Sequence, residues 1–167
     1  MTVSRAVNDK DGISDATRER VRAIANRLGY RPSLIARSLV TDRTGTIGLV
    51  VIDNANPFFS EIARGVEHAA YHEGYSVFLC NTDEDAQRER DVLRSLEEKR
   101  VDGIVLCSSR LTGPELGSTL SQSHTVLINR RTSDRRYDTV LVDDVRGGQQ
   151  ATDYLIQRGH RAIGFLA

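Results

Sequence analysis

The pattern of apolar and polar positions divides the chain into two parts with different predicted secondary structure. Residues 2–8 predict a short helix, and residues 9–12 predict a polar turn. Ser14 has the side chain of a helix N-cap. The helix that follows carries one apolar stripe at i, i+3, i+4 and i+7, formed by Val21, Ile24, Ala25 and Leu28. Gly29 is placed to end this helix as a C-cap.

The next segment marks a boundary. Residues 33–39 (SLIARSL) predict two turns of helix, a length that is marginal for an isolated helix in water. Residues 41–46 (TDRTGT) are polar and predict a linker. We therefore predict two domains with boundaries 1–46 and 47–167.

After the linker, apolar runs alternate with helical patterns. The runs predict strands at 46–52, 75–81, 102–108, 124–129, 139–143 and 162–167. Helices are predicted after Pro57 and at 85–99, 113–121 and 147–159, the first with an apolar face of Phe59, Ile62, Ala63, Val66 and Ala70. This alternation indicates an α/β fold with a doubly wound, mostly parallel sheet.

Ligands in such sheets bind beyond the carboxyl ends of the strands. Those ends are Asp53–Phe59, Asn81–Asp85, Ser108–Leu111, Asn129–Arg131 and Asp143–Val145. Amides and rings at a strand end, as in Asn54, Asn56 and Phe58, suit a sugar or a planar small molecule. Phe59 fits the apolar face of its helix as a core residue, so Phe58 is the better candidate for binding.

Composition narrows the class of protein. The length of 167 residues suffices for one full domain or for one domain plus a small module, and 39% hydrophobic and 28% charged residues are typical of a globular protein. No apolar run approaches the roughly 20 residues of a membrane span, and the start lacks the pattern of a signal peptide. We expect a cytoplasmic protein without membrane contact. Cys80 and Cys107 look like buried strand residues with reduced thiols.

The net charge of the chain is zero, but the charges are unevenly distributed along it. Residues 1–46 carry nine basic and five acidic residues, net +4, and residues 47–167 carry 14 and 18, net −4. A basic segment on an acidic body favours an anionic partner for the first part, although sampling in a short segment could give the same difference.

Motifs of common enzymes are missing. The sequence has no GxxxxGK[ST] loop, no GxGxxG after a strand and no GxSxG elbow. His68 and His72 stand four apart, but the HExxH pattern fails and both fall opposite the apolar face of their helix. Asp143 and Asp144 could form an acid–base pair, yet a ligand-hydroxyl acceptor or a helix N-cap is favoured. We expect no metal, no cofactor and no enzyme activity.

The first 46 residues carry chemistry suited to DNA. A short helix with Thr, Ser, Arg and Asn side chains has the donors and acceptors that read base edges in a major groove. Arginines on the next helix would lie near phosphates. Within 33–39, Ile35, Ala36 and Leu39 offer an apolar wedge of the kind that unstacks a base step from the minor groove.

Together these segments resemble the LacI/GalR family of bacterial transcription regulators. The resemblance lies in TVSRAVN, ISDATRERVRAIANRLGYRPSLIARSL and TGTIGLVV, and continues through NPFFSEIARGVEHAAYHEGYSVFLCNTD, RVDGIVLCSS, VLINRR, VLVDD and LIQRGHRAIGFLA. It covers essentially the whole chain in the family's order. It implies a helix-turn-helix headpiece, a hinge helix and a periplasmic-binding-protein-like core. The resemblance further implies that the regulator binds operator DNA as a homodimer under control of a small effector, often a sugar.

The resemblance also assigns residues to roles. On the recognition helix it places Thr2, Ser4, Arg5 and Asn8. Tyr30 and Pro32 lead into the hinge helix, where Ala36 and Leu39 meet the minor groove. The effector segment includes Phe58 and Phe59, a strand end supplies Asn129 and Arg130, and Asp144 lies near the same cleft. Asn56, whose amide precedes Phe58, is added to this effector set.

Two expected parts of the family pattern are not in this sequence: the first headpiece helix before Thr2 and the second core lobe after Ala167. The resemblance therefore implies a fragment with a partial headpiece, a hinge and the first lobe. We expect weak or no specific operator binding and weak effector binding by this fragment. The alternative function is a cytoplasmic sugar-binding protein without DNA activity, and residues 1–46 argue against it.

Overall fold

A computed structural model describes residues 2–7, 11–30, 38, 43–120 and 123–166, without the side chains of residues 2, 4 and 7. The chain forms two compact units, Met1–Gly45 and Thr46–Ala167, which we describe separately. The predicted helix over 33–39 lies outside the described residues apart from Ser38.

The first unit contains two helices, α1 (Thr2–Val7) and α2 (Asp15–Arg27). Ser14 caps α2 as predicted, since its Oγ accepts a bond of 3.4 Å from the Thr17 N–H. Gly29 has a φ of 63°, the left-handed conformation that ends helices. None of the thirteen residues of α2 is buried, so its predicted apolar stripe is covered only in part.

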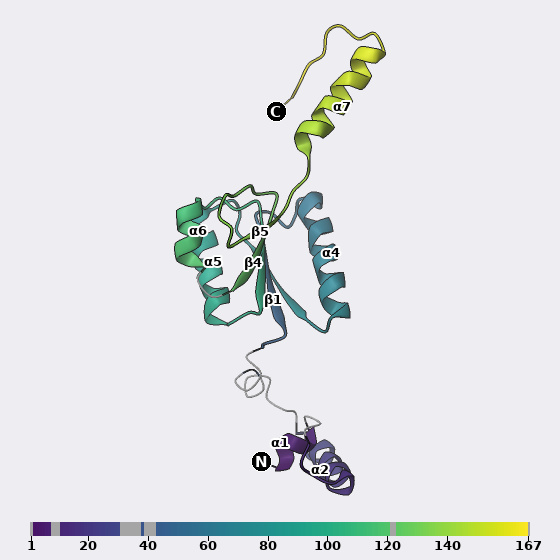
Figure 1. The fold of residues 1–167 in the computed structure, drawn as a ribbon, viewed down its shortest axis with the longest axis vertical. Coiled ribbons are helices and arrows are strands. Elements are labelled where there is room, and N and C mark those ends of the chain that lie inside the picture. Colours follow the sequence, from purple (N-terminus) through teal and green to yellow (C-terminus); the bar gives the residue numbers. More distant parts are fainter. Residues whose placement is uncertain (1, 8–10, 31–37, 39–42, 121–122, 167) are drawn as a thin grey trace. The chain divides into compact units, whose positions relative to one another are not determined.

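The second unit is built on one parallel sheet, with the order β2-β1-β3-β4-β5 over the described residues. The strands are β1 (Thr46–Val51), β2 (Ser76–Asn81), β3 (Gly103–Cys107), β4 (His124–Ile128) and β5 (Asp138–Val140). The helices are α4 (Pro57–His72), α5 (Ala86–Glu98), α6 (Gly113–Thr119) and α7 (Asp144–Gln157). Helix α4 covers one face of the sheet, and α5 and α6 cover the other (Figure 1). This confirms the predicted α/β class.

Two apolar clusters fill the space between the sheet and its helices. Side chains of a strand alternate between faces, so Leu49 and Val51 of β1 pack with Phe59 of α4, whereas Val50 packs with Leu93 and Leu96 of α5. Strand β1 is thus buried on both faces, which explains its uninterrupted apolar sequence.

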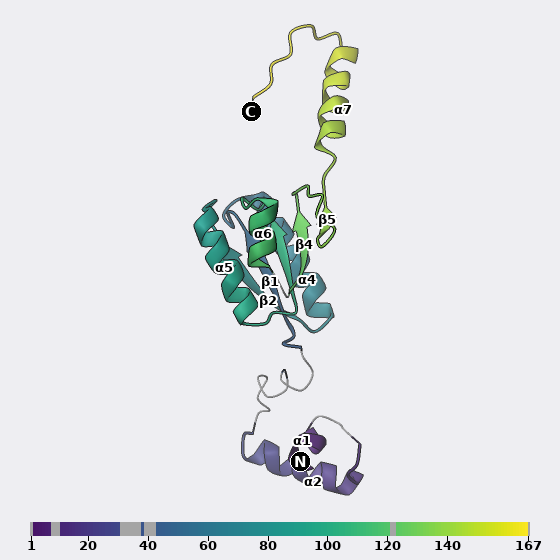
Figure 2. The same ribbon diagram turned by 60° about the vertical axis from the view of Figure 1, so that its left-hand side comes forward.

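The predicted strand over 162–167 is wrong for the residues described there. Residues 162–166 form no strand and are exposed, and α7 before them has no buried residue. Figure 2 shows this end of the chain extending from α7 without lying along β5. An apolar run becomes a strand only when another strand supplies hydrogen bonds, and residues 162–166 have no such neighbour within the described sheet. The fifth strand is also shorter than predicted.

Candidate functional site

The carboxyl ends of the strands gather the polar residues predicted there. In a sheet of this order, β1 and β3 are neighbours whose connections run in opposite directions, so their carboxyl ends flank the topological switch point where ligands bind. The loop after β1 is fixed by the Asn54 N–H, which donates over 3.0 Å to Oδ1 of Asn81, the last residue of β2. The Ala55 N–H donates to Asp53 Oδ1 over 2.9 Å.

Residues 56–59 begin α4 at this edge. Asn56 is the N-cap, and its Oδ1 accepts from the Phe58 N–H over 3.0 Å. Phe58 is 45% exposed and Phe59 only 6%, with their ring centroids 5.0 Å apart in an edge-to-face arrangement. The prediction that Phe59 is a core residue is confirmed. Phe58 is the ring available to a ligand.

The acidic residues after β2 are held by arginines. Asp83 and Glu84 both have positive φ, of 52° and 59°. The Asp83 carboxylate pairs with Arg88, and the Glu84 carboxylate pairs with Arg110. Thr82 is buried and donates from its backbone N–H to the Val51 carbonyl over 3.0 Å. Both carboxylates of the acidic turn therefore have an arginine partner at this edge.

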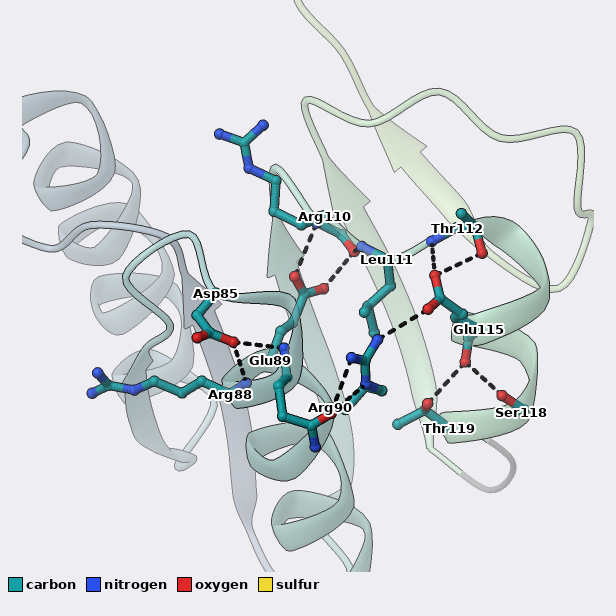
Figure 3. A network of polar contacts seen from close by, with 12 residues as sticks. Asp85, Arg88, Glu89, Arg90, Arg110, Leu111, Thr112, Glu115, Ser118 and Thr119 are labelled. Carbon is teal, nitrogen blue, oxygen red and sulfur yellow. Dashed lines mark hydrogen bonds and ion pairs between the residues drawn. The ribbon is translucent and has the colours of Figure 1, made fainter.

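Residues 108–111, after β3, are held by a charged residue that sequence analysis did not identify. Glu89 of α5 is 1% exposed, and its carboxylate accepts from the Ser109 hydroxyl and from the Arg110 N–H (Figure 3). The sequence does carry a signal for it. Glu89 precedes Leu93 and Leu96 by four and seven residues, which places it on the inward face of α5.

The two residues after β4 lie beside this loop. Asn129 has a φ of 54°, and its Nδ2 is 3.5 Å from Ser108 Oγ. The Arg130 guanidinium donates to the carbonyls of Ser109 and Leu111 over 2.8 and 2.6 Å. The structure thus brings Asn129 and Arg130 together with the β3 end, as expected for strand ends of a parallel sheet.

Asp143 and Asp144 have a different role from Asn129 and Arg130. Asp143 is the N-cap of α7 and accepts from the Arg146 N–H over 3.0 Å, so the helix-cap interpretation is confirmed for this residue. Asp144 is exposed in the first turn of α7. A contact between Asp144 and a ligand stays a prediction.

Among the candidates for other chemistry, the thiols are poor nucleophiles. Burial raises the pKa of the Cys107 thiol to about 11 and, against the opposing charge of Lys99, also raises that of Cys80. His68 and His72 are exposed on α4, with ring centroids 4.6 Å apart. Over the described part of the chain, no group of three or more His, Cys, Asp or Glu side chains could hold a metal ion.

The candidate DNA-reading residues lie in the first unit. Ala6 is fully buried, and its carbonyl accepts from Arg22 Nε of α2 over 3.1 Å, which holds α1 against α2. Arg5 is exposed, and Tyr30 is 52% exposed. Thr2 and Ser4 lie within α1, but their side chains are not described. The predictions for Asn8, Ala36 and Leu39 lie outside the described residues.

No helix in the described residues combines the length and the apolar character needed to cross a membrane.

Family profiles match both units of the chain. One, described as "Bacterial regulatory proteins, lacI family", matches residues 1–33. The other, described as "Periplasmic binding proteins and sugar binding domain of LacI family", matches residues 44–167.

Curated relatives align along nearly all of the chain. The HTH-type transcriptional regulator RegA of Clostridium saccharobutylicum is 41% identical, over 99% of this chain and 50% of that protein. The ribose operon repressor of Escherichia coli K12 is 38% identical, over 99% of this chain and 51% of that protein. The chain therefore spans about half the length of the curated relatives it matches.

A solved structure supports the fold. The lac repressor dimer bound to operator and the anti-inducer ONPF superposes with a TM-score of 0.83 at 23% identity, covering 98% of this chain and 50% of that one. At this identity the likeness concerns the fold alone.

Proposed function

Because the chain belongs to the LacI family of bacterial regulatory proteins, we propose that it supplies DNA-reading and effector-binding parts of a transcriptional repressor. One observation carries the proposal. A basic helix pair that matches the family's regulatory-protein profile and a sheet unit that matches its sugar-binding profile are joined in one chain. The protein is proposed to work in the cytoplasm, as a homodimer on operator DNA, and without enzyme activity.

The DNA-reading role rests on charge and on the helix pair. Arg5 lies exposed on α1, which Arg22 ties to α2, so a short helix is presented on a longer one. A net charge of +4 over residues 1–46 provides attraction to phosphates. In this proposal Thr2, Ser4, Arg5 and Asn8 read bases, and Tyr30, Ala36 and Leu39 contact DNA beyond the helix pair.

The effector-binding role rests on the carboxyl edge. Phe58 offers an exposed ring, and Asn129 and Arg130 offer amide and guanidinium donors at the next strand ends. Rings and a few oriented polar groups are what a sugar requires. One relative is named a ribose operon repressor, so D-ribose is the first effector to test. Asn56 and Asp144 complete the proposed set, whereas Phe59 packs in the core behind Phe58 and supports that ring.

Fluorescence anisotropy with a labelled duplex tests the DNA-reading role. The duplex is selected from a random pool by the 167-residue chain at low salt. We expect binding that weakens steeply with salt and an Arg5→Ala variant that binds at least about tenfold more weakly on the selected sequence. Arg64→Ala, an exposed arginine of α4, is the control and keeps wild-type affinity. Equal affinity of Arg5→Ala and wild type for the selected duplex, together with binding that does not weaken with salt, would favour the sugar-binding protein without DNA function.

Calorimetry with D-ribose tests the effector role. We expect heat of binding in the wild type and its loss in Asn129→Ala, because the amide donor beside Ser108 is removed. The matched control is Asn26→Ala in α2, which lies in the other unit. Equal binding by wild type and Asn129→Ala would contradict the placement of the site.

A further inference from the structure

One peptide group at the carboxyl edge lies between two opposite charges. The peptide bond that joins Ser109 to Arg110 donates its N–H to Glu89 Oε2 over 2.9 Å and accepts at its carbonyl from Arg130 Nη1 over 2.8 Å. The bond is trans, so its N–H and C=O point to opposite sides. The carboxylate and the guanidinium therefore hold the same peptide from opposite directions, in the orientation that its dipole favours.

Other bonds of the same two side chains strengthen this arrangement. Glu89 Oε1 accepts from the Ser109 hydroxyl, which in turn accepts from the Leu111 N–H over 3.2 Å. Arg130 Nη2 donates to the Leu111 carbonyl over 2.6 Å. Every one of these groups lies in residues 109–111, so Glu89 and Arg130 act on one short loop.

Burial makes the carboxylate a strong constraint. Glu89 is 1% exposed and Ser109 is 4% exposed. A buried carboxylate that loses its donors has no water to replace them, so the loop and Glu89 hold each other in place. Figure 3 shows Glu89 reaching from α5 to this loop, beside the separate Arg90–Glu115 pair that joins α5 to α6.

We infer that Glu89 is a positioning residue for effector recognition, acting through the Ser109–Arg110 peptide on Arg130. The inference rests on the proposed function of Arg130. With two nitrogens bound to loop carbonyls, the planar guanidinium is fixed in direction, and its remaining N–H groups are oriented for oxygens of a polyhydroxylated ligand. Without the Glu89 charge, the peptide is free to rotate and Arg130 loses its orientation before any ligand arrives.

Nuclear magnetic resonance of the nitrogen-15-labelled 167-residue chain tests the inference without a ligand. Glu89→Gln keeps the shape of the side chain but replaces one acceptor with a donor. We expect the Arg110 amide to exchange about 10 to 100 times faster and the Arg130 Nε–H resonance, identified by its loss in Arg130→Lys, to move. Asp91→Asn, an exposed change on the same helix, is the control and leaves both signals in place.

A second variant covers the case in which Glu89→Gln does not fold. Ser109→Ala removes only the hydroxyl between Glu89 and Leu111. It should move the Arg130 resonance in the same direction by a smaller amount. A folded Glu89→Gln whose Arg130 resonance coincides with that of the wild type would overturn the inference, as would an unmoved resonance in Ser109→Ala if Glu89→Gln is unfolded.

Titration with D-ribose separates this inference from the proposed function. If the wild type binds D-ribose, Glu89→Gln should bind about tenfold more weakly and Asp91→Asn equally well. Equal affinity of Glu89→Gln and wild type would overturn the positioning role. If the wild type shows no response to D-ribose, the sugar assignment fails, and the Arg130 resonance in the unliganded variants alone decides the positioning role.

Discussion

The two units of this chain are stabilised in different ways. The sheet unit buries both faces of β1 and fills the space under α5 with fully buried leucines. The helix pair has no buried residue in α2, and Ile24 and Leu28 of its apolar stripe are 40% and 73% exposed. Amphipathic helices of similar pattern thus end in different environments. A stripe stabilises a helix only to the extent that another element covers it.

The same contrast exists within the sheet unit. Helices α4 and α7 are both amphipathic, yet α4 buries Phe59 and Ala70 against the sheet whereas α7 buries none of its residues. Both helices begin with a local side-chain N-cap, since Asn56 accepts from the N–H two residues on and Asp143 from the N–H three residues on. Packing decided which of them contributes to the core.

The largest expected effect comes from opening the core of the sheet unit. Leu96→Ala removes a side chain that is 2% exposed, and we expect it to lower the free energy of unfolding by about 2–5 kcal/mol. Amide hydrogen exchange measures the change separately in each unit. Protection of β1 should fall strongly, and protection of α2 should stay unchanged. An equal fall in α2 would show that the two units unfold together.

A pair of glycines gives the second comparison. A Cβ at Gly48 would lie 2.7 Å from Leu96 Cδ1 and 3.1 Å from Leu96 Cδ2. The Leu96 side chain is buried, so it has little room to move away from the added methyl group. We expect Gly48→Ala to destabilise the sheet unit by about 1–3 kcal/mol. Gly65 in α4 has open space at its Cβ, so Gly65→Ala should stabilise by about 0.5–1 kcal/mol. Urea unfolding followed by circular dichroism measures both, and destabilisation of the same size in both variants would refute the steric argument.

A smaller effect is expected on the pH dependence of stability. The N–H groups of Arg88 and Gln87 donate to the Asp85 carboxylate and hold its pKa below the ordinary value, with help from the charges of Arg90 and Arg88. A carboxyl whose pKa is lowered by folding stabilises the fold above its unfolded pKa of about 4. This contribution is lost as the pH falls through the folded pKa.

Asp85→Asn keeps a capping oxygen but cannot titrate, so it isolates that contribution. Thermal unfolding between pH 3 and 7 should show a difference in Tm between wild type and variant that becomes smaller towards low pH. Glu115 and Asp134 also have lowered pKa values, from bonds with Thr112 and Arg136, and their effect is common to both proteins. A difference in Tm that does not depend on pH would contradict the role of the Asp85 charge.

The smallest effect is expected in the helix pair. Ile24→Ala removes an apolar side chain of α2 that is 40% exposed. We expect a change of at most about 0.5 kcal/mol, as for surface positions away from a core. Hydrogen exchange of the α2 amides provides the measurement. A loss as large as that of Leu96→Ala would show that Ile24 packs in solution against an element that the described residues do not include.

Much of the candidate site could be predicted because it depends on chain order. Strand ends of a parallel sheet meet at one edge, so the positions of Asn129 and of the loop after β3 follow once the strands are identified. The separate roles of Phe58 and Phe59 follow from helical periodicity. Glu89 was not identified, since a charged residue on an inward helix face is recognisable as part of a site only when its hydrogen-bond partners are known.

By itself, the sequence determined the caps, the turns and the order of the elements from β1 to α7, because these depend on residues within a few positions of one another. Only the tertiary structure decided which apolar segments become core. Residues 162–166 resemble β1 in composition but form no strand, since a strand requires neighbours for its backbone groups. The tertiary structure also decided that a buried carboxylate and an arginine from distant segments would hold one peptide between them.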